Sequence, residues 1–148
     1  MVSLSRRLFW IVSRVAFAFY NRFPIYGTLR SAVGIIRRGS DYLVIDRADG
    51  RGLGFPGGLA RRRESDEQTL RREVAEETGL AVSSAEYLFR CSVSKPVPAS
   101  IAVFRVTAEG NLHGSWEGEP RWVTPAELRS RITKTQRPIV EQLANWNS

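Results

Sequence analysis

Three glutamates stand close together in one short stretch of the sequence. Glu73, Glu76 and Glu77 are spaced i, i+3 and i+4, which places them at neighbouring positions on one helix face. Carboxylates this close repel one another, and salt bridges or a bound cation relieve the repulsion. A hard divalent cation prefers several carboxylate oxygens and suits phosphate-bearing substrates. The stretch therefore indicates either a solvated acidic face, with Arg72 paired to Glu76, or a metal site.

The residues around this row form a longer pattern. From Gly58 the sequence reads Gly, five residues, Glu64, seven residues, and then Arg72-Glu73-Val74-x-Glu76-Glu77-x-Gly79-Leu80. The pattern resembles the Nudix box, the signature of the Nudix hydrolase family, at every defined position. Average residue frequencies put a chance match on the order of 10⁻⁸ per chain. Strand patterns around the box extend the resemblance to residues 31–148.

This resemblance implies an enzyme that uses Mg²⁺ or Mn²⁺ to hydrolyse a nucleoside diphosphate linked to a further moiety, X. Water must attack a phosphorus whose oxygens are already negative, so neutralising charge is the main requirement. The substrate is then a nucleotide sugar such as ADP-ribose, or a nucleoside triphosphate. The rival interpretation is a Nudix-fold module that binds a nucleotide or RNA without cleaving it. The implied metal ligands are the carboxylates of Glu73, Glu76 and Glu77 and the backbone carbonyl of Gly57.

The resemblance also assigns supporting roles. Arg72 would orient the glutamates through ion pairs, and Glu64 would brace the preceding loop. Gly58 and Gly79 would supply backbone conformations that side chains oppose.

A remote carboxylate is expected from the segment Glu117-Gly118-Glu119-Pro120-Arg121-Trp122. We expect Glu119 rather than Glu117 to be this further metal ligand, the alternative being an acid that faces solvent.

The loop before Glu64 departs from the family pattern. Relatives commonly carry a Glu and then a Gly immediately before the box glutamate, whereas this chain has Arg61-Arg62-Arg63. Arg63 stands where a glycine could adopt a positive φ without steric cost. Arg61 and Arg63 are candidates to bind the terminal phosphate of the substrate. The alternative is a solvated basic loop that balances the acidic helix.

The elements that must position these residues are visible in the sequence. Ser65-Asp66-Glu67-Gln68 has the form of a capping box, and Gly79 is a stop signal, so a helix is expected between them. A second capping box is expected at Thr124, and a closing helix from Pro138. Strands are expected at 32–36, 42–45, 53–55, 86–94 and 100–106. The expected fold is α/β, a mixed β-sheet sandwiched between helices (α/β/α).

The charge of the chain is concentrated at its start. The formal net charge is +7, and residues 1–40 hold seven of the 22 basic side chains and no acid. This leaves 15 basic and 15 acidic side chains in the other 108 residues. A body that is electrically neutral argues against a domain that coats nucleic acid. The single cysteine, Cys91, excludes an internal disulfide, and we expect the protein in the cytoplasm.

Residues 1–30 form an arm outside the resemblance. Leu8 to Tyr20 is apolar except for Ser13 and Arg14, and its periodicity predicts an amphipathic helix. The run is too short for a membrane span. An arginine interrupts the apolar region that a secretory signal needs, which argues against such a signal. Two interpretations stay open: a helix that lies at the inner face of the membrane, and a helix that packs on its own domain or on a second subunit. These alternatives predict either a peripheral membrane contact or a homodimer, in both cases through residues 1–23.

Overall fold

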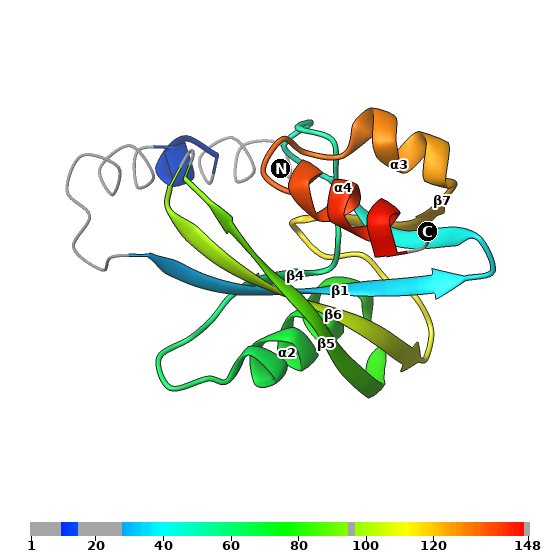
Figure 1. The fold of residues 1–148 in the computed structure, drawn as a ribbon, viewed down its shortest axis with the longest axis horizontal. Coiled ribbons are helices and arrows are strands. Elements are labelled where there is room, and N and C mark those ends of the chain that lie inside the picture. Colours follow the sequence, from blue (N-terminus) through cyan, green and yellow to red (C-terminus); the bar gives the residue numbers. More distant parts are fainter. Residues whose placement is uncertain (1–9, 15–27, 95–96, 147–148) are drawn as a thin grey trace.

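A mixed β-sheet lies in the middle of the molecule, with helices on both of its faces (Figure 1). The computed structural model describes residues 10–14, 28–94 and 97–146. Strand β1 runs parallel to β6, and the other pairings are antiparallel, in the order β3-β2-β1-β6-β5, with β4 on β1 and β7 on β2. The predicted α/β/α architecture is confirmed. The elements are β1 (Leu29–Arg38), β2 (Asp41–Arg47), β3 (Leu53–Gly54), β4 (Gly57–Leu59), α2 (Asp66–Thr78), β5 (Ala81–Val93), β6 (Ala99–Glu109), β7 (Gly118–Val123), α3 (Pro125–Arg131) and α4 (Arg137–Trp146).

The sheet buries an apolar core on each face because its strands alternate their side chains. In β1, Val33 and Ile35 join the core beneath α3 and α4. Ala32 and Ile36 face the other way, toward α2. The helix α2 contributes Leu70 and Val74 to this second core, and both are fully buried. The acidic row of α2 is thus carried on a helix whose opposite side is fixed to the sheet.

The ends of α2 match the sequence signals. The Ser65 hydroxyl accepts from the Gln68 N–H at 3.1 Å, and the Gln68 side chain accepts from the Ser65 N–H at 2.9 Å. This reciprocal pair completes the predicted capping box. At the other end Gly79 adopts φ 77° and closes the helix as predicted.

Two elements differ from the sequence expectations. Strand β5 begins at Ala81 rather than near residue 86, because its first half pairs with β6 as a two-stranded ribbon. Thr124 caps α3, with its hydroxyl accepting from the Glu127 N–H at 3.2 Å. The Glu127 carboxylate turns to Arg121 and Arg131 instead, so the second capping box is only half formed.

Little of the N-terminal arm lies within the described residues. Trp10–Arg14 is helical, with the Arg14 guanidinium 4.5 Å from the centre of the Trp10 ring. Ile11 and Val12, from the predicted apolar face, are exposed. Among the described helices, none is long and apolar enough to cross a membrane. The rest of the predicted amphipathic helix falls outside the described residues, and its role stays a prediction.

Gly79 should be far less replaceable than a glycine of similar conformation in open space. An added Cβ at Gly79 would lie 2.2 Å from the His113 ring, whereas at Gly39, with φ 61°, it would meet nothing within 4 Å. We expect Gly39→Ala to lower the free energy of unfolding by about 1–2 kcal/mol through left-handed strain alone. Gly79→Ala should lower it clearly more, since it also displaces the segment containing His113. Urea unfolding of both variants measures this difference, and equal losses would refute it.

Candidate active site

The three glutamates of the row occupy different environments on α2. Glu73 and Glu77 are buried, while the side chain of Glu76 is 52% exposed. Burial raises the pKa of Glu73 even though the Arg72 guanidinium beside it acts in the opposite direction. The row is therefore not a solvated face of equivalent acids, because two of its three members are largely removed from water.

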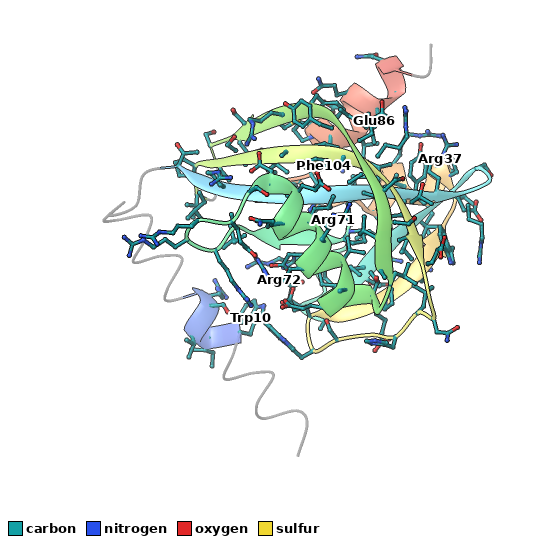
Figure 2. The ribbon with its side chains drawn as sticks, turned by 90° about the horizontal axis from the view of Figure 1, so that it is seen from below. Trp10, Arg37, Arg71, Arg72, Glu86 and Phe104 are labelled. Atoms are coloured by element: carbon teal, nitrogen blue, oxygen red, sulfur yellow. The ribbon has the colours of Figure 1, made fainter. Side chains whose placement is uncertain are left out.

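Arg72 links the row to the loop before the helix, from its position on the side of α2 shown in Figure 2. Its guanidinium binds Glu64 through two nitrogens, at 2.8 and 2.9 Å, which is the bidentate geometry that arginine favours. The same group donates to Glu73 at 2.6 Å, to Glu76 at 3.4 Å and to the Leu59 carbonyl at 2.9 Å. The contacts are those expected of a side chain that orients the glutamates and braces the loop.

Gly57 and Gly58 allow the loop to approach the helix closely. An added Cβ on Gly58 would lie 2.6–2.9 Å from the Glu73 carboxyl group. An added Cβ on Gly57 would lie 2.1 Å from the Ala32 carbonyl oxygen, and its φ of 154° is one that side chains rarely adopt. The Gly57 N–H donates to Glu77 at 2.9 Å. Both positions thus require glycine, because the space is filled at Gly58 by the Glu73 carboxyl group and at Gly57 by Ala32 and Val33 of β1.

Glu77 shares a hydrogen bond with a carboxyl group from another part of the chain. Burial, together with the neighbouring Glu117 and Glu73, raises the pKa of Glu77 well above its ordinary value, although the Gly57 N–H opposes this. Two carboxyl groups can form a hydrogen bond only when one of them carries a proton. In the place of that proton, a cation would satisfy both groups at once.

The residue that reaches Glu77 is Glu117, whereas the sequence analysis preferred Glu119 as the remote carboxylate. The carboxyl group of Glu119 lies against Gly114, where an added Cβ would come within 2.3–2.7 Å of it. Glu117 precedes β7 and its carbonyl accepts from the Ala48 N–H at 2.8 Å. Glu117, and not Glu119, is therefore the acid that lies beside Glu77, and a metal-binding role for either residue stays a prediction.

The sequence analysis also missed Arg47 at the end of β2. Its guanidinium is held by Asp49 at 2.6 and 3.1 Å. The hydrogen bond to Asp49 raises the pKa of Arg47, and the charges of Glu117 and Glu77 act in the same direction. The site therefore has a cation beside its carboxyl pair, but an arginine at a strand end has no sequence signal to distinguish it.

The loop that contains Arg61, Arg62 and Arg63 forms a turn, in which Arg63 has a backbone conformation that glycine usually adopts. The Glu64 N–H donates to the Arg61 carbonyl at 3.1 Å, and Arg63 has φ 68°. Arg61 lies beside Glu76 at 3.5 Å, while Arg63 is exposed and enters none of the ion pairs found within the described residues. Of the two predicted phosphate-binding arginines, the structure brings only Arg61 to the row.

The site suits a hard divalent cation in the chemistry of its donors, although its carboxyl groups are not assembled around one point. No three acidic, His or Cys side chains within the described ranges form a ready-made metal cage. Glu73 is turned to Arg72, and Glu76 to Arg72 and Arg61. The buried Glu77 carboxyl group with Glu117 beside it, however, needs a positive partner or a proton, and carboxylate oxygens are the ligands that Mg²⁺ prefers.

Comparison with known proteins places this arrangement in a family. A family model for the NUDIX domain matches residues 28–143. The chain belongs to the Nudix family. A search of curated proteins gave no significant match. The Nudix assignment thus rests on the family model and on solved structures.

Several solved structures share the fold. A Nudix hydrolase family member from Chromobacterium violaceum is 27% identical, with a TM-score of 0.70 over 83% of this chain and 81% of its own. MutT from Aliivibrio salmonicida and Vibrio cholerae is 26% identical, with a TM-score of 0.66 over 79% and 96%. A MutT Nudix hydrolase from Burkholderia pseudomallei, at 22% identity and a TM-score of 0.70 over 78% and 98%, supports the fold alone. The family and these neighbours identify the chain as a hydrolase.

Replacing Arg63 by glycine should stabilise this Nudix domain. The left-handed conformation costs a residue with a side chain about 1–2 kcal/mol. Glycine removes this cost, but its greater chain entropy in the unfolded state offsets part of the gain in stability. We expect Arg63→Gly to raise the free energy of unfolding by about 0.5–1 kcal/mol. Arg62→Gly, at the neighbouring exposed position without positive φ, should lower it instead. Urea unfolding tests the pair, and a loss of stability in both variants would contradict the argument.

The Glu64–Arg72 pair should give stability a characteristic pH dependence. Hydrogen bonding from Arg72 lowers the pKa of Glu64 from 4.5 to about 2 in the folded chain. A folded-state pKa below the unfolded value means that this stabilisation is present above pH 4.5 and is lost as the pH falls toward 2. The difference in unfolding free energy between the native chain and Glu64→Gln should therefore shrink across that window. In an Arg72→Gln background the difference should depend on pH much less, and a difference unchanged by pH in the native background would disprove the assignment.

Proposed function

We propose that this hydrolase is a pyrophosphohydrolase dependent on Mg²⁺ or Mn²⁺, which cleaves the diphosphate of a nucleoside diphosphate linked to X. The observation that carries the proposal is the buried Glu77 carboxyl group, which has the carboxyl group of the exposed Glu117 as a neighbour and the charge of Arg47 close by. Folding alone gains nothing from a buried carboxyl group that has a second carboxyl group beside it. A cation that replaces their shared proton makes the arrangement favourable and explains why both are aimed at the same place.

Glu77 and Glu117 would hold the metal, together with Glu76 and Glu73 of the same helix and the Gly57 carbonyl. When bound there, the metal supplies neutralisation of phosphate charge and a water of lowered pKa. Glu76 is exposed and its ion pairs are 3.4–3.5 Å long, so its carboxylate is free to turn. One of these glutamates would also accept the proton of the attacking water.

Arginines prepare the same site for a polyanion. Arg72 keeps Glu73 fixed through its short ion pair while it is itself locked to Glu64. Arg47 and Arg61 approach the acidic row from two sides, on β2 and on the loop before α2. Phosphate oxygens bind arginine through charge-assisted hydrogen bonds, so both residues would contact the substrate's phosphates once these displace the intramolecular pairs.

The identity of X is proposed only as a class. A nucleotide sugar such as ADP-ribose and a nucleoside triphosphate both present a diphosphate bonded to a nucleoside, which is the part that the acidic row and the arginines would bind. A panel of both classes, read out by phosphate and pyrophosphate release, separates them by their products.

Two neighbouring glutamates offer a matched test of the assignment. We expect Glu77→Gln and Glu117→Gln to lower kcat with Mg²⁺ by about 100-fold or more, a loss of the size seen when one electrostatic group of an active site is removed. Glu119→Gln should keep near-native kcat, because its carboxyl group lies against Gly114. Chelation of divalent metal should abolish turnover and added Mg²⁺ or Mn²⁺ should restore it.

The outcomes distinguish the proposal from its rivals. Loss of activity in Glu119→Gln with retention in Glu117→Gln would overturn the choice of carboxylate. Near-native turnover in Glu77→Gln would overturn the metal site itself. Binding of nucleotides or RNA with no hydrolysis of any member of the panel would favour a module that recognises its ligand without cleaving it.

A further inference from the structure

A tight turn carries Glu117 to the carboxyl pair and presents a tryptophan beside it. Ser115 and Gly118 face each other as an antiparallel bridge, with N–H to carbonyl distances of 3.1 and 3.3 Å. The two residues between them are Trp116 and Glu117. The Glu117 N–H also donates to the Ser115 hydroxyl at 3.2 Å. This is a two-residue hairpin connection, in which the orientation of both central residues is fixed by the backbone.

The turn is anchored to the active site from two directions. The Ala48 N–H binds the Glu117 carbonyl at 2.8 Å, which attaches the turn to the segment after Arg47. The Glu117 carboxyl group is hydrogen-bonded to Glu77 on α2. The preceding segment is attached to the end of the same helix, where the His113 N–H donates to the Thr78 carbonyl at 3.0 Å. Trp116 therefore has a defined place about one residue spacing, ~3.8 Å along the chain, from a proposed metal ligand.

Trp116 exposes most of its large apolar surface at this place. It is 60% exposed, the highest value among the described large hydrophobic residues. Trp122, six residues further along the chain in β7, is half-buried, and the Arg38 guanidinium lies 4.4 Å from the centre of its ring. Trp116 therefore presents a large aromatic surface to solvent at the position that precedes Glu117 in the chain.

We propose that Trp116 is the residue on which the nucleobase of the substrate stacks. The proposal rests on the proposed function, since the phosphates at Glu77 and Glu117 fix where the substrate begins. A nucleoside extends outward from its phosphates and ends in a flat aromatic ring, and the exposed indole of Trp116, next in the chain to Glu117, is a flat aromatic surface on which such a ring can stack. Stacking on an aromatic side chain accepts every base, because each base has a π-face. Trp116 would thus select substrates that carry a base over sugar phosphates that do not.

Binding of nucleoside monophosphates measures this contact without any chemical step, since they contain no diphosphate. We would titrate the full chain with AMP, GMP, CMP and UMP, and with ribose 5-phosphate, in the presence of Mg²⁺, by calorimetry. Trp116→Ala should weaken binding of the tightest nucleotide by about 5- to 150-fold and leave ribose 5-phosphate unchanged. Trp116→Phe should restore most of the affinity. Leu112→Ala removes another exposed apolar side chain from the same connection and should leave both ligands unaffected.

The results separate this inference from the proposed function. If Trp116→Ala bound nucleotides as tightly as the native chain does, the stacking role would be overturned. An equal loss of ribose 5-phosphate binding would also overturn it, because that loss would indicate a collapsed turn. Nucleotides that bind no better than ribose 5-phosphate to the native chain would also overturn it. A selective loss of nucleotide binding in a chain that hydrolyses no substrate would support the stacking role and reject the hydrolase proposal. Hydrolysis by the native chain, with no effect of Trp116→Ala on nucleotide binding, would support the hydrolase proposal and reject the stacking role.

Discussion

The burial of the Glu77 carboxyl group is the constraint on which the rest of the site depends. A carboxyl group removed from water needs hydrogen-bond donors, a proton or a cation. The structure supplies the Gly57 N–H from the loop and the Glu117 carboxyl group from the turn before β7. Both segments are therefore held within reach of one side chain on α2. Glycine at position 57 lets β4 approach β1 closely, since a side chain there would collide with the Ala32 carbonyl, and in this position its N–H reaches Glu77.

Arg72 reduces the electrostatic repulsion between the glutamates of the acidic row. One guanidinium contacts Glu64, Glu73 and Glu76, so the helix and the loop before it share a single cation. Locking Arg72 to Glu64 through two hydrogen bonds limits how far it can follow either of the other acids. The row is thus kept partly neutralised in the absence of ligand and remains able to rearrange, because Glu76 stays exposed.

The local part of this site could be predicted from the sequence, whereas the long-range part could not. Helix spacing and the Nudix box gave the acidic row, the partners of Arg72 and the cap at Gly79, which are all contacts within about twenty residues. The position of Glu117 rather than Glu119 beside Glu77 could not be predicted, because it depends on the turn from Ser115 to Gly118 and on the contact of that turn with Ala48. Arg47 became part of the site only through the pairing of β2 with β7.

The central claim is that a divalent cation takes the place of the proton shared by Glu77 and Glu117. Titration of the full chain with Mg²⁺ or Mn²⁺ near pH 7, in buffers of different ionisation enthalpy, measures binding and proton release together. The account predicts saturable binding with release of about one proton, and loss of that release in Glu117→Gln but not in Glu119→Gln. Binding without proton release, or no binding to the native chain, would contradict it.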